Sequence, residues 1–180
     1  HTSVADTPTL AIGCGSNGCI AKTMTFQGVS AHAGGSPQKG VNALYAANLA
    51  MNAANALRET FTEREYIRFH PIITNGGDAV NAIPDTVTME SYVRGATMES
   101  ILNTNKKINR AFSACAAAMG AKVHIRDIPG YWPRQYPDDF VVAFEEAAKQ
   151  VLDNVKIHNA WGTGCSDMGD VGAVMPIIHP

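Results

Sequence analysis

The order in which two hydrophobic periodicities alternate constrains the fold of this chain more than any other feature. From Cys19 to Gln27 apolar and polar residues alternate with a period of two, as in a half-buried strand. Residues 41–60 then carry apolar side chains at helical spacing without an interior glycine or proline, which predicts a long helix. A second strand is expected over Tyr66–Thr74. Its interruption at Pro71, which has no backbone donor, favours a sheet edge or a bulge.

The same periods recur in the next stretch of chain. Alternation over residues 87–94 predicts a third strand. Thr97 can cap a second helix, whose apolar residues recur at threes, fours and sevens until Gly120 supplies a left-handed stop. Residues 122–128 supply a fourth strand. The order strand, helix, strand, strand, helix, strand predicts an α+β ferredoxin-like βαββαβ sandwich, in which two helices cover one face of a four-stranded antiparallel sheet.

The character of the sequence changes after Pro129. An aromatic and proline-rich connector leads to an expected helix over Asp138–Leu152 and then to a glycine-rich segment. We therefore expect residues 19–129 to form one domain and residues 130–180 to start part of a second one. Because the chain begins without methionine and ends without a terminal helix or polar tail, we expect a piece of a longer protein.

Composition excludes several classes of partner. The formal charge is -2, and no run of Lys or Arg alternates with aromatic residues, which argues against nucleic acid and anionic membranes. The four cysteines form no C-x-x-C pair, so free thiols are expected rather than a zinc knuckle or a disulfide scaffold. We find no signal peptide and no membrane-spanning apolar run, and these features favour a cytoplasmic location.

One histidine lies in a glycine-rich turn between the first strand and the first helix. Gly34, Gly35 and Gly40 surround His32, and Pro37 stiffens the same loop. Glycines let a backbone take positive φ and approach another group closely. We therefore interpret His32 as a side chain offered to a ligand; the alternative is a turn histidine that bonds its own backbone.

Asn81 and Arg94 are further candidate binding residues. Asn81 can offer its amide to a substrate, although an Asx-turn is an equally ordinary use of asparagine before a strand. Arg94 ends the third strand and can grip a carboxylate through two parallel hydrogen bonds. The alternative for Arg94 is an ion pair with Glu90. Asp167 and Asp170 flank Gly169 in a turn, where such residues are ordinarily solvated or cap a helix.

Four ordered motifs carry a resemblance to a known family. They are Gly28-x-x-Ala31-His32-Ala33-Gly34-x-x-Pro37-x-x-Gly40-x-Asn42-Ala43, Asn81-Ala-Ile-Pro84-Asp85, Val93-Arg94-Gly95 and Ser166-Asp-Met-Gly-Asp170. Together they resemble the dinuclear-zinc amidohydrolases, the peptidase family that includes aminoacylase, carboxypeptidase G, hippurate hydrolase and aminobenzoyl-glutamate hydrolase. The resemblance is closest to the last branch.

The resemblance implies a lid domain inserted into an α/β catalytic domain. Residues 19–129 would be the lid, which also forms a homodimer, and residues 1–18 and 130–180 would be stubs of the catalytic domain. The complete protein would use two zinc ions to cleave amide bonds of N-acyl amino acids, aminobenzoyl-glutamate-like conjugates or small dipeptides. Most of the metal ligands would lie upstream of His1, so this piece alone would bind no zinc and be inactive.

The resemblance also implies roles for single residues. His32 would cross the dimer interface and donate a hydrogen bond to the substrate carbonyl as its oxygen gains negative charge. Asn81 would line the substrate surface of the lid, and Arg94 would hold the terminal carboxylate of the substrate. His1 stands where the hippurate hydrolase branch carries a zinc-ligating histidine; a tag remnant or a free chain end is the alternative. Asp167 and Asp170 would lie in an active-site loop. The last ligand histidine of this branch would lie beyond Pro180, so His179 would either support the metal ligands without touching the metal or be structural.

Two other functional classes compete with the hydrolase. A ferredoxin-like sandwich can be a non-catalytic dimerisation or binding module, which is compatible with every feature of the lid. It can also bind nucleic acid or a small ligand on its sheet. That use needs exposed aromatic and basic residues, and the predicted strands supply mainly Tyr66, Arg68 and Tyr92, which is too few for nucleic acid.

Overall fold

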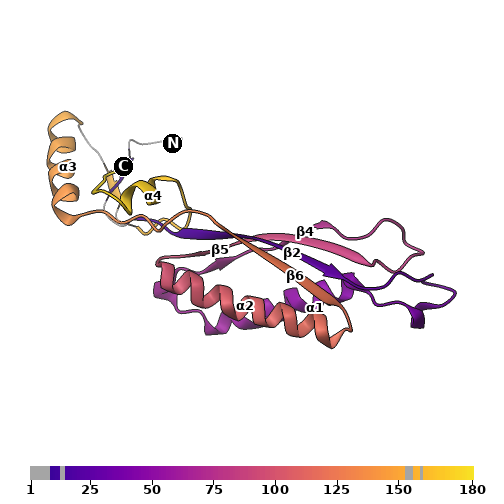
Figure 1. Ribbon diagram of the computed structural model, residues 1–180. Helices are drawn as coiled ribbons and strands as arrows, with labels where there is room; N and C mark the ends of the chain where they lie inside the picture. Colours follow the sequence, from indigo (N-terminus) through magenta and orange to yellow (C-terminus); the bar gives the residue numbers. More distant parts are fainter. Residues whose placement is uncertain (1–8, 13–14, 153–155, 159) are drawn as a thin grey trace.

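The computed structural model describes residues 9–12, 15–152, 156–158 and 160–180. These residues form an elongated molecule with two parts (Figure 1). A sandwich of one sheet and two helices makes up most of its length. A smaller body, formed by the described residues before Gly18 and after Pro129, lies at one end of the sandwich, and two long loops project from the other end.

The sheet of the sandwich is antiparallel throughout. Strand β2 (Gly18–Gln27) lies at its centre between β5 (Thr86–Gly95) and β6 (Lys122–Pro129). The short strands β3 (Arg68–Phe69) and β4 (Ile72–Asn75) both pair with the outer side of β5. The strand expected over residues 66–74 is thus divided at Pro71, which is why the sheet has five strands rather than four. The predicted ferredoxin-like order and the edge position of Pro71 are confirmed.

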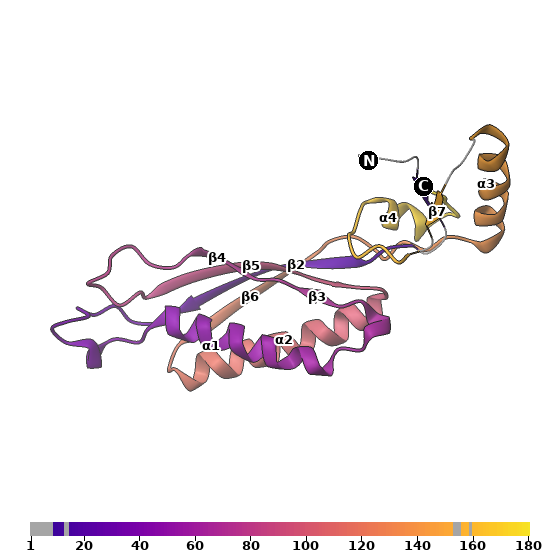
Figure 2. The same ribbon diagram turned by 180° about the vertical axis from the view of Figure 1, so that it is seen from behind.

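Two helices cover one face of the sheet, as the views from the front and from behind show (Figures 1 and 2). Helix α1 (Ala43–Ala56) begins at Asn42, whose side-chain oxygen accepts a hydrogen bond from the Tyr45 amide. The helix expected from the sequence extends to residue 60, but α1 ends at Ala56 and a 3-10 turn takes up residues 57–60. Helix α2 (Met98–Ala118) begins at the predicted cap Thr97 and is followed by Gly120 at a φ of 72°.

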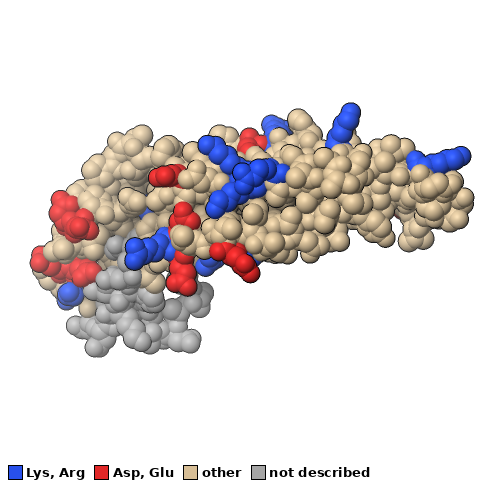
Figure 3. Space-filling model, turned by 90° about the horizontal axis from the view of Figure 1, so that it is seen from below, with Lys and Arg blue, Asp and Glu red and all other residues tan. Residues whose placement is uncertain are grey.

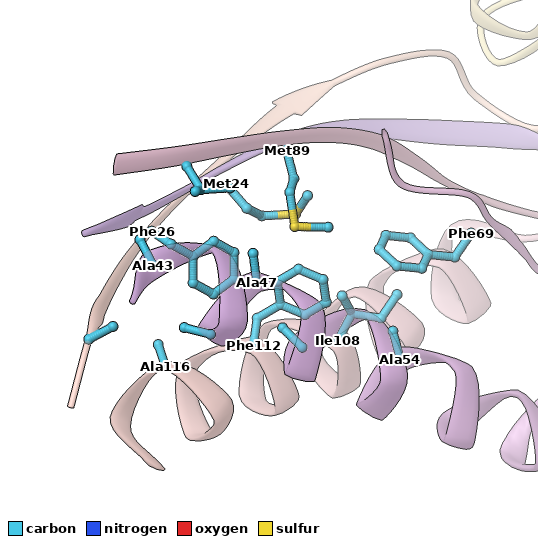
Figure 4. Packing of buried hydrophobic residues seen from close by; sticks show 14 of the residues in the cluster. Met24, Phe26, Ala43, Ala47, Ala54, Phe69, Met89, Ile108, Phe112 and Ala116 are labelled. Atoms are coloured by element: carbon cyan, nitrogen blue, oxygen red, sulfur yellow. The ribbon is translucent and has the colours of Figure 1, made fainter. Parts of the chain in front are cut away.

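The core lies between the sheet and the helices (Figure 4). Met24 and Phe26 of β2 and Met89 of β5 point down onto the helices, where Phe112 of α2 contacts Phe26 with ring centroids 5.9 Å apart. The buried residues of α1 are all alanines: Ala43, Ala46, Ala47, Ala50 and Ala54. Small side chains let α1 pack closely against the large residues of the sheet and α2.

One lysine is buried on the helix-facing side of the sheet. The Lys22 side chain is 0% exposed, and its ammonium forms an ion pair with Asp127 of β6 and donates to Asn109 of α2. The second Asp127 oxygen accepts from the amides of Asn105 and Asn109. Burial lowers the pKa of Lys22, and the hydrogen bonds to Asp127 oppose this shift. Burial alone would raise the pKa of Asp127, but hydrogen bonds from Lys22, Asn105 and Asn109 hold it below its ordinary value.

The smaller body joins segments that lie far apart in the sequence. Strand β1 (Thr9–Ala11) pairs in parallel with β7 (Lys156–His158), and helices α3 (Asp138–Val151) and α4 (Met168–Gly172) accompany them. The Ser16 amide donates to the Arg134 carbonyl oxygen, so the two chain crossings between the parts are hydrogen-bonded to each other. Parallel pairing of this kind is typical of α/β domains.

The charged surface is mixed. On the face that the helices cover, Lys and Arg gather near the middle with Asp and Glu beside them, and most of the surface toward the projecting loops is uncharged (Figure 3). Within the described part of the chain, no helix combines the length and the apolar character needed to cross a bilayer.

Replacing Asp127 tests how much the buried ion pair stabilises the sandwich. In Asp127→Asn the Lys22 ammonium stays buried without a carboxylate, and we expect the free energy of unfolding at pH 7 to fall by about 3 kcal/mol. Urea unfolding of the 180-residue chain measures the change. Glu90→Gln, which alters an exposed carboxylate without an ion pair among the described residues, is the control and should change stability by less than about 0.5 kcal/mol. Equal stability of the two variants would show that the Lys22–Asp127 ion pair does not stabilise the sandwich.

The pH dependence follows from the direction of the Asp127 shift. Because the folded state lowers the pKa of this carboxyl below 3.8, its contribution is complete above that value and is lost as the pH falls through the folded pKa. We therefore expect the stability difference between the wild-type chain and Asp127→Asn to shrink in acid. A difference that grows below pH 4 would be inconsistent with this ion pair.

Candidate functional site

Two loops form a single projection, which we call the arm. The loops consist of residues 28–42 and 76–85, and they lie at the end of the sandwich that points away from the smaller body (Figure 1). Val29 and Val41 pair across the first loop. The second loop is tied to it, because the Ala33 amide donates to the Asn81 carbonyl oxygen at 2.8 Å and the Ile83 amide to the Ala31 carbonyl oxygen at 2.9 Å. The arm is therefore held by backbone hydrogen bonds between its loops.

His32 is exposed on the arm, and its ring is oriented by its own loop. Its Nδ1 accepts hydrogen bonds from the Gly35 amide at 2.8 Å and from the Gly34 amide at 3.2 Å. A ring nitrogen that accepts from two amides carries no proton, so the proton of the neutral ring lies on Nε2. The structure thus shows the alternative from the sequence, a turn histidine that bonds its own backbone, at Nδ1. The offer of this side chain to a ligand stays a prediction, which would use Nε2.

The glycines of the first loop let its backbone lie close to the His32 ring and to the second loop. Among the described glycines, positive φ occurs at Gly15, Gly77 and Gly120, so the expected positive φ at Gly34, Gly35 and Gly40 is wrong. A Cβ at Gly35 would lie 3.3 Å from His32 Nδ1, and one at Gly40 would lie 2.8 Å from Ile83 Cδ1. The absence of side chains lets the loop fold onto the imidazole and onto the second loop.

Asn81 lies beside His32 on the arm. The residue is exposed, and its carbonyl oxygen accepts from Ala33, directly after His32 in the sequence. Within the described ranges its side chain makes no hydrogen bond, so the Asx-turn alternative is not observed there. Asn81 is therefore an exposed residue of the arm, and its contact with a ligand stays a prediction.

Arg94 lies at the other end of the sheet. The chain register pairs Gly18 with Gly95 at the smaller body and Gln27 with Thr86 at the arm. Ten residues of β2 therefore separate the two ends, a distance of about 30 Å at the rise of an extended strand. The three residues predicted to contact substrate do not meet within one chain: His32 and Asn81 lie together, and Arg94 lies apart.

The surroundings of Arg94 form a cavity against the smaller body. A hollow of about 390 Å³ is lined by Arg68, His70, Tyr92, Arg94, Thr163 and Gly164. The Arg94 guanidinium carbon lies 5.2 Å from the centre of the Tyr92 ring, a cation–π contact. The alternative ion pair with Glu90 is absent from the described residues, because positions four apart in a strand lie about 13 Å from each other.

Sequence reasoning missed a pair of cysteines. Cys19 Sγ of β2 and Cys165 Sγ of the smaller body lie 3.4 Å apart, although 146 positions separate them. Burial, with a smaller effect of the neighbouring Cys19 thiol, raises the pKa of Cys165 to about 11. Cys19, Cys115 and Cys165 are free thiols, as expected, and Cys14 lies outside the described residues. No signal in the sequence links Cys19 to Cys165.

Two of the remaining candidates, Asp170 and His179, are hydrogen-bonded within the smaller body. Asp170 Oδ1 accepts from the Trp132 amide at 2.9 Å, and the His179 carbonyl oxygen accepts from the Tyr136 hydroxyl at 2.6 Å. Among residues 9–12, 15–152, 156–158 and 160–180, no three His, Cys, Asp or Glu side chains converge on a possible metal position. The described side chains therefore do not form a zinc site, and His1 lies outside the described residues.

Comparisons with known proteins agree with this architecture. A family model described as a peptidase dimerisation domain matches residues 14–124. The chain is 32% identical to the Xaa-Arg dipeptidase of Mus musculus over 88% of its own length and 37% of that protein. It is 31% identical to the indole-3-acetyl-aspartic acid hydrolase of Enterobacter agglomerans over 63% of its length and 26% of that protein. The chain thus spans less than two-fifths of these curated relatives.

A solved structure shares the fold. The aminobenzoyl-glutamate utilization protein of Klebsiella pneumoniae superimposes with a TM-score of 0.69 at 22% identity, over 93% of this chain and 44% of that one. The family match covers more than half of the chain and coincides with the sandwich and its arm. The chain therefore belongs to the M20 peptidase dimerisation domain family, whose members are peptidases and amidohydrolases.

Proposed function

We propose that the complete protein carrying this chain hydrolyses amide bonds of N-acyl amino acids, aminobenzoyl-glutamate-like conjugates or small dipeptides. The observation that carries the proposal is the exposed His32 residue, whose Nδ1 accepts from two amides so that Nε2 carries the ring proton. The relatives named for dipeptide and acyl-amino-acid hydrolysis support the reaction class. In this proposal residues 1–18 and 130–180 belong to the catalytic domain, and residues 19–129 form the lid.

We place a homodimer interface along β4 and the adjacent face of α1. Strand β4 is exposed at the sheet edge, where Ile72 and Ile73 are 52% and 37% exposed. Tyr45 and Leu49, four residues apart on α1, are 62% and 39% exposed. An unpaired edge beside exposed apolar side chains favours association with a second copy. Antiparallel pairing of two β4 edges reverses the molecule, so the arm of one subunit extends toward the smaller body of its partner.

The reversal assigns the three site residues to two subunits. Arg94 holds the terminal carboxylate of the substrate within its own subunit, next to the smaller body. The partner subunit supplies His32 and Asn81 on its arm. His32 Nε2–H donates to the carbonyl oxygen as it gains negative charge, and this ring has no need to lose or gain a proton in that step. The Asn81 amide contacts the substrate beside it.

We further propose that hydrolysis requires divalent metal, two zinc ions by the resemblance of the motifs. Their ligands would lie outside the described residues, because those residues contain no converging ligand group. A cytoplasmic location fits the free thiols of Cys19, Cys115 and Cys165. The alternative function is a dimerisation module without catalysis, and loss of activity upon replacing His32 distinguishes the two.

The orientation of His32 predicts its tautomer. We expect the neutral ring to carry its proton on Nε2, because two amides occupy Nδ1. Long-range ¹H–¹⁵N correlation spectra of the chain at pH 8 measure the tautomer directly. His124, an exposed residue of β6 whose ring has no hydrogen bond among the described residues, is the control and should show a mixture. A proton on Nδ1 of His32 would rule out its proposed donor role.

Mixed dimers test whether the site is shared between subunits. We expect His32→Ala and Arg94→Ala each to lower kcat/KM of the complete protein roughly 100-fold or more. In a heterodimer of the two variants, one of the two sites has both residues intact, so about half of the wild-type activity should return. Co-expression with two different tags isolates the heterodimer for the assay.

The matched control pairs two changes on the same arm. A heterodimer of His32→Ala and Asn81→Ala has a defective arm in each site and should stay inactive. Recovery in this control, or none in the first heterodimer, would disprove the division of the site between subunits.

Chelation tests whether the metal is needed for hydrolysis alone or also for the dimer of the lid. We expect a chelator to abolish hydrolysis by the complete protein and zinc to restore it, while the dimer mass from light scattering stays constant, because the described sandwich holds no metal-ligand cluster. Dissociation of the dimer on chelation would show that metal supports the interface and would contradict this separation.

A further inference from the structure

The cavity beside Arg94 contains a second arginine that the proposed reaction does not use. Arg68 of β3 is the direct cross-strand partner of Arg94 of β5, and both residues line the hollow together with His70 and Tyr92. We propose that this cavity is a subsite for an acidic amino-acid side chain, with Arg68 as the residue that selects glutamate or aspartate at the carboxyl end of the substrate. The inference rests on the proposed function, in which Arg94 binds the terminal carboxylate of the substrate.

Two like charges directly opposite each other are an unusual arrangement for a sheet. Side chains of a direct antiparallel pair lie on the same face with Cβ atoms about 5 Å apart, and like charges in such positions destabilise the sheet. Within the described part of the chain, the ion pairs are Lys22 with Asp127 and Lys149 with Glu145, and neither includes Arg68 or Arg94. The two guanidiniums thus lack a carboxylate partner there, which favours an anionic ligand between them.

Both guanidiniums are held in place on the protein side. Arg68 Nη1 donates to the Ile67 carbonyl oxygen at 2.9 Å, which leaves its other N–H groups for a ligand. The Arg94 guanidinium lies over the Tyr92 ring. An arginine fixed in this way loses less side-chain freedom when it binds a carboxylate. His70 adds a ring to the same lining, and Thr163 contributes a hydroxyl from the smaller body.

Charge balance predicts which substrate fits. If Arg94 binds the terminal carboxylate, a substrate with a neutral side chain leaves the Arg68 charge uncompensated, and one with a basic side chain adds a third positive charge. A second carboxylate neutralises Arg68 and can accept two parallel hydrogen bonds from it. The subsite therefore favours glutamate and aspartate over their amides and disfavours a carboxyl-terminal arginine, the residue in the name of the mammalian dipeptidase relative.

Binding of two isosteric probes tests the subsite. Calorimetry on the chelator-treated complete protein, which cannot consume the probes, compares N-acetylglutamate with N-acetylglutamine. We expect the glutamate derivative to bind about 10-fold more tightly, the effect of a hydrogen-bonded charge pair. Arg68→Gln should remove this preference and leave the N-acetylglutamine affinity within about 2-fold. Arg126→Gln, which alters an exposed arginine of β6 outside the cavity, should keep the preference.

A charge reversal makes the test independent of any loss of structure. In Arg68→Glu we expect N-acetylarginine to bind more tightly than N-acetylglutamate. Equal binding of N-acetylglutamate and N-acetylglutamine by the wild type would overturn the proposal. An equal loss of both affinities in Arg68→Gln would also overturn it, because it would indicate a structural role for Arg68. Inorganic phosphate that binds as tightly as N-acetylglutamate would overturn it as well, because it would indicate an unspecific anion site.

Hydrolysis assays distinguish failure of the subsite from failure of the proposed function. If the complete protein hydrolyses N-acylglutamate and N-acylglutamine with equal kcat/KM, the acidic subsite is wrong and the hydrolase stands. If it hydrolyses neither while the Arg68-dependent binding preference is present, the hydrolase is wrong and the subsite stands.

Discussion

The ten-residue antiparallel pairing of β2 with β5 is the constraint on which the rest of the structure depends. Its register joins Gly18 to Gly95 at one end and Gln27 to Thr86 at the other. The first end fixes the sheet to the smaller body, and the second fixes both loops of the arm. The same hydrogen bonds that build the centre of the sheet therefore set the distance between Arg94 and His32. A site that uses both residues must draw them from two subunits.

The core of the sandwich is unusual because it contains a buried charge. This core is a layer of methionine, phenylalanine, isoleucine and valine side chains packed against the alanine face of α1. Lys22 interrupts that layer with a charge that is fully buried and satisfied by Asp127 and Asn109. Buried ion pairs contribute little net stability against apolar replacements, but they tolerate the loss of one partner poorly. The network links the central strand to the edge strand β6 and to α2 by directional bonds.

The arm and the cavity hold their polar side chains in different ways. On the arm, the backbone of residues 34 and 35 orients an exposed ring, so His32 presents one fixed donor without support from a folded core. In the cavity, strand pairing brings two arginines together that repulsion would separate. In our proposals both arrangements serve an interaction with another molecule, and only the arginine pair costs local stability, as functional positions often do.

Much of the fold was predictable because local signals agreed with it. Alternation marked β2 and β5, Asn42 and Thr97 marked the helix starts, and Pro71 marked the edge of the sheet. The end of α1 was not predictable, because residues 57–60 have helical composition and the chain turns there into a tighter helix. The conformation of Gly34 and Gly35 was also misjudged, since a glycine can serve a turn through close approach as well as through positive φ.

The sequence alone determined the order of strands and helices and the identity of the residues with exposed chemistry, because both depend on side-chain types at short spacings along the chain. Only the tertiary structure decided which of those residues meet. The pairing of Arg68 with Arg94 and the distance from the arm to Arg94 follow from strand register. The proximity of His32 to Asn81 and the contact of Cys19 with Cys165 follow from how loops pack against other segments. Register is a relation between distant segments, and no local spacing specifies it.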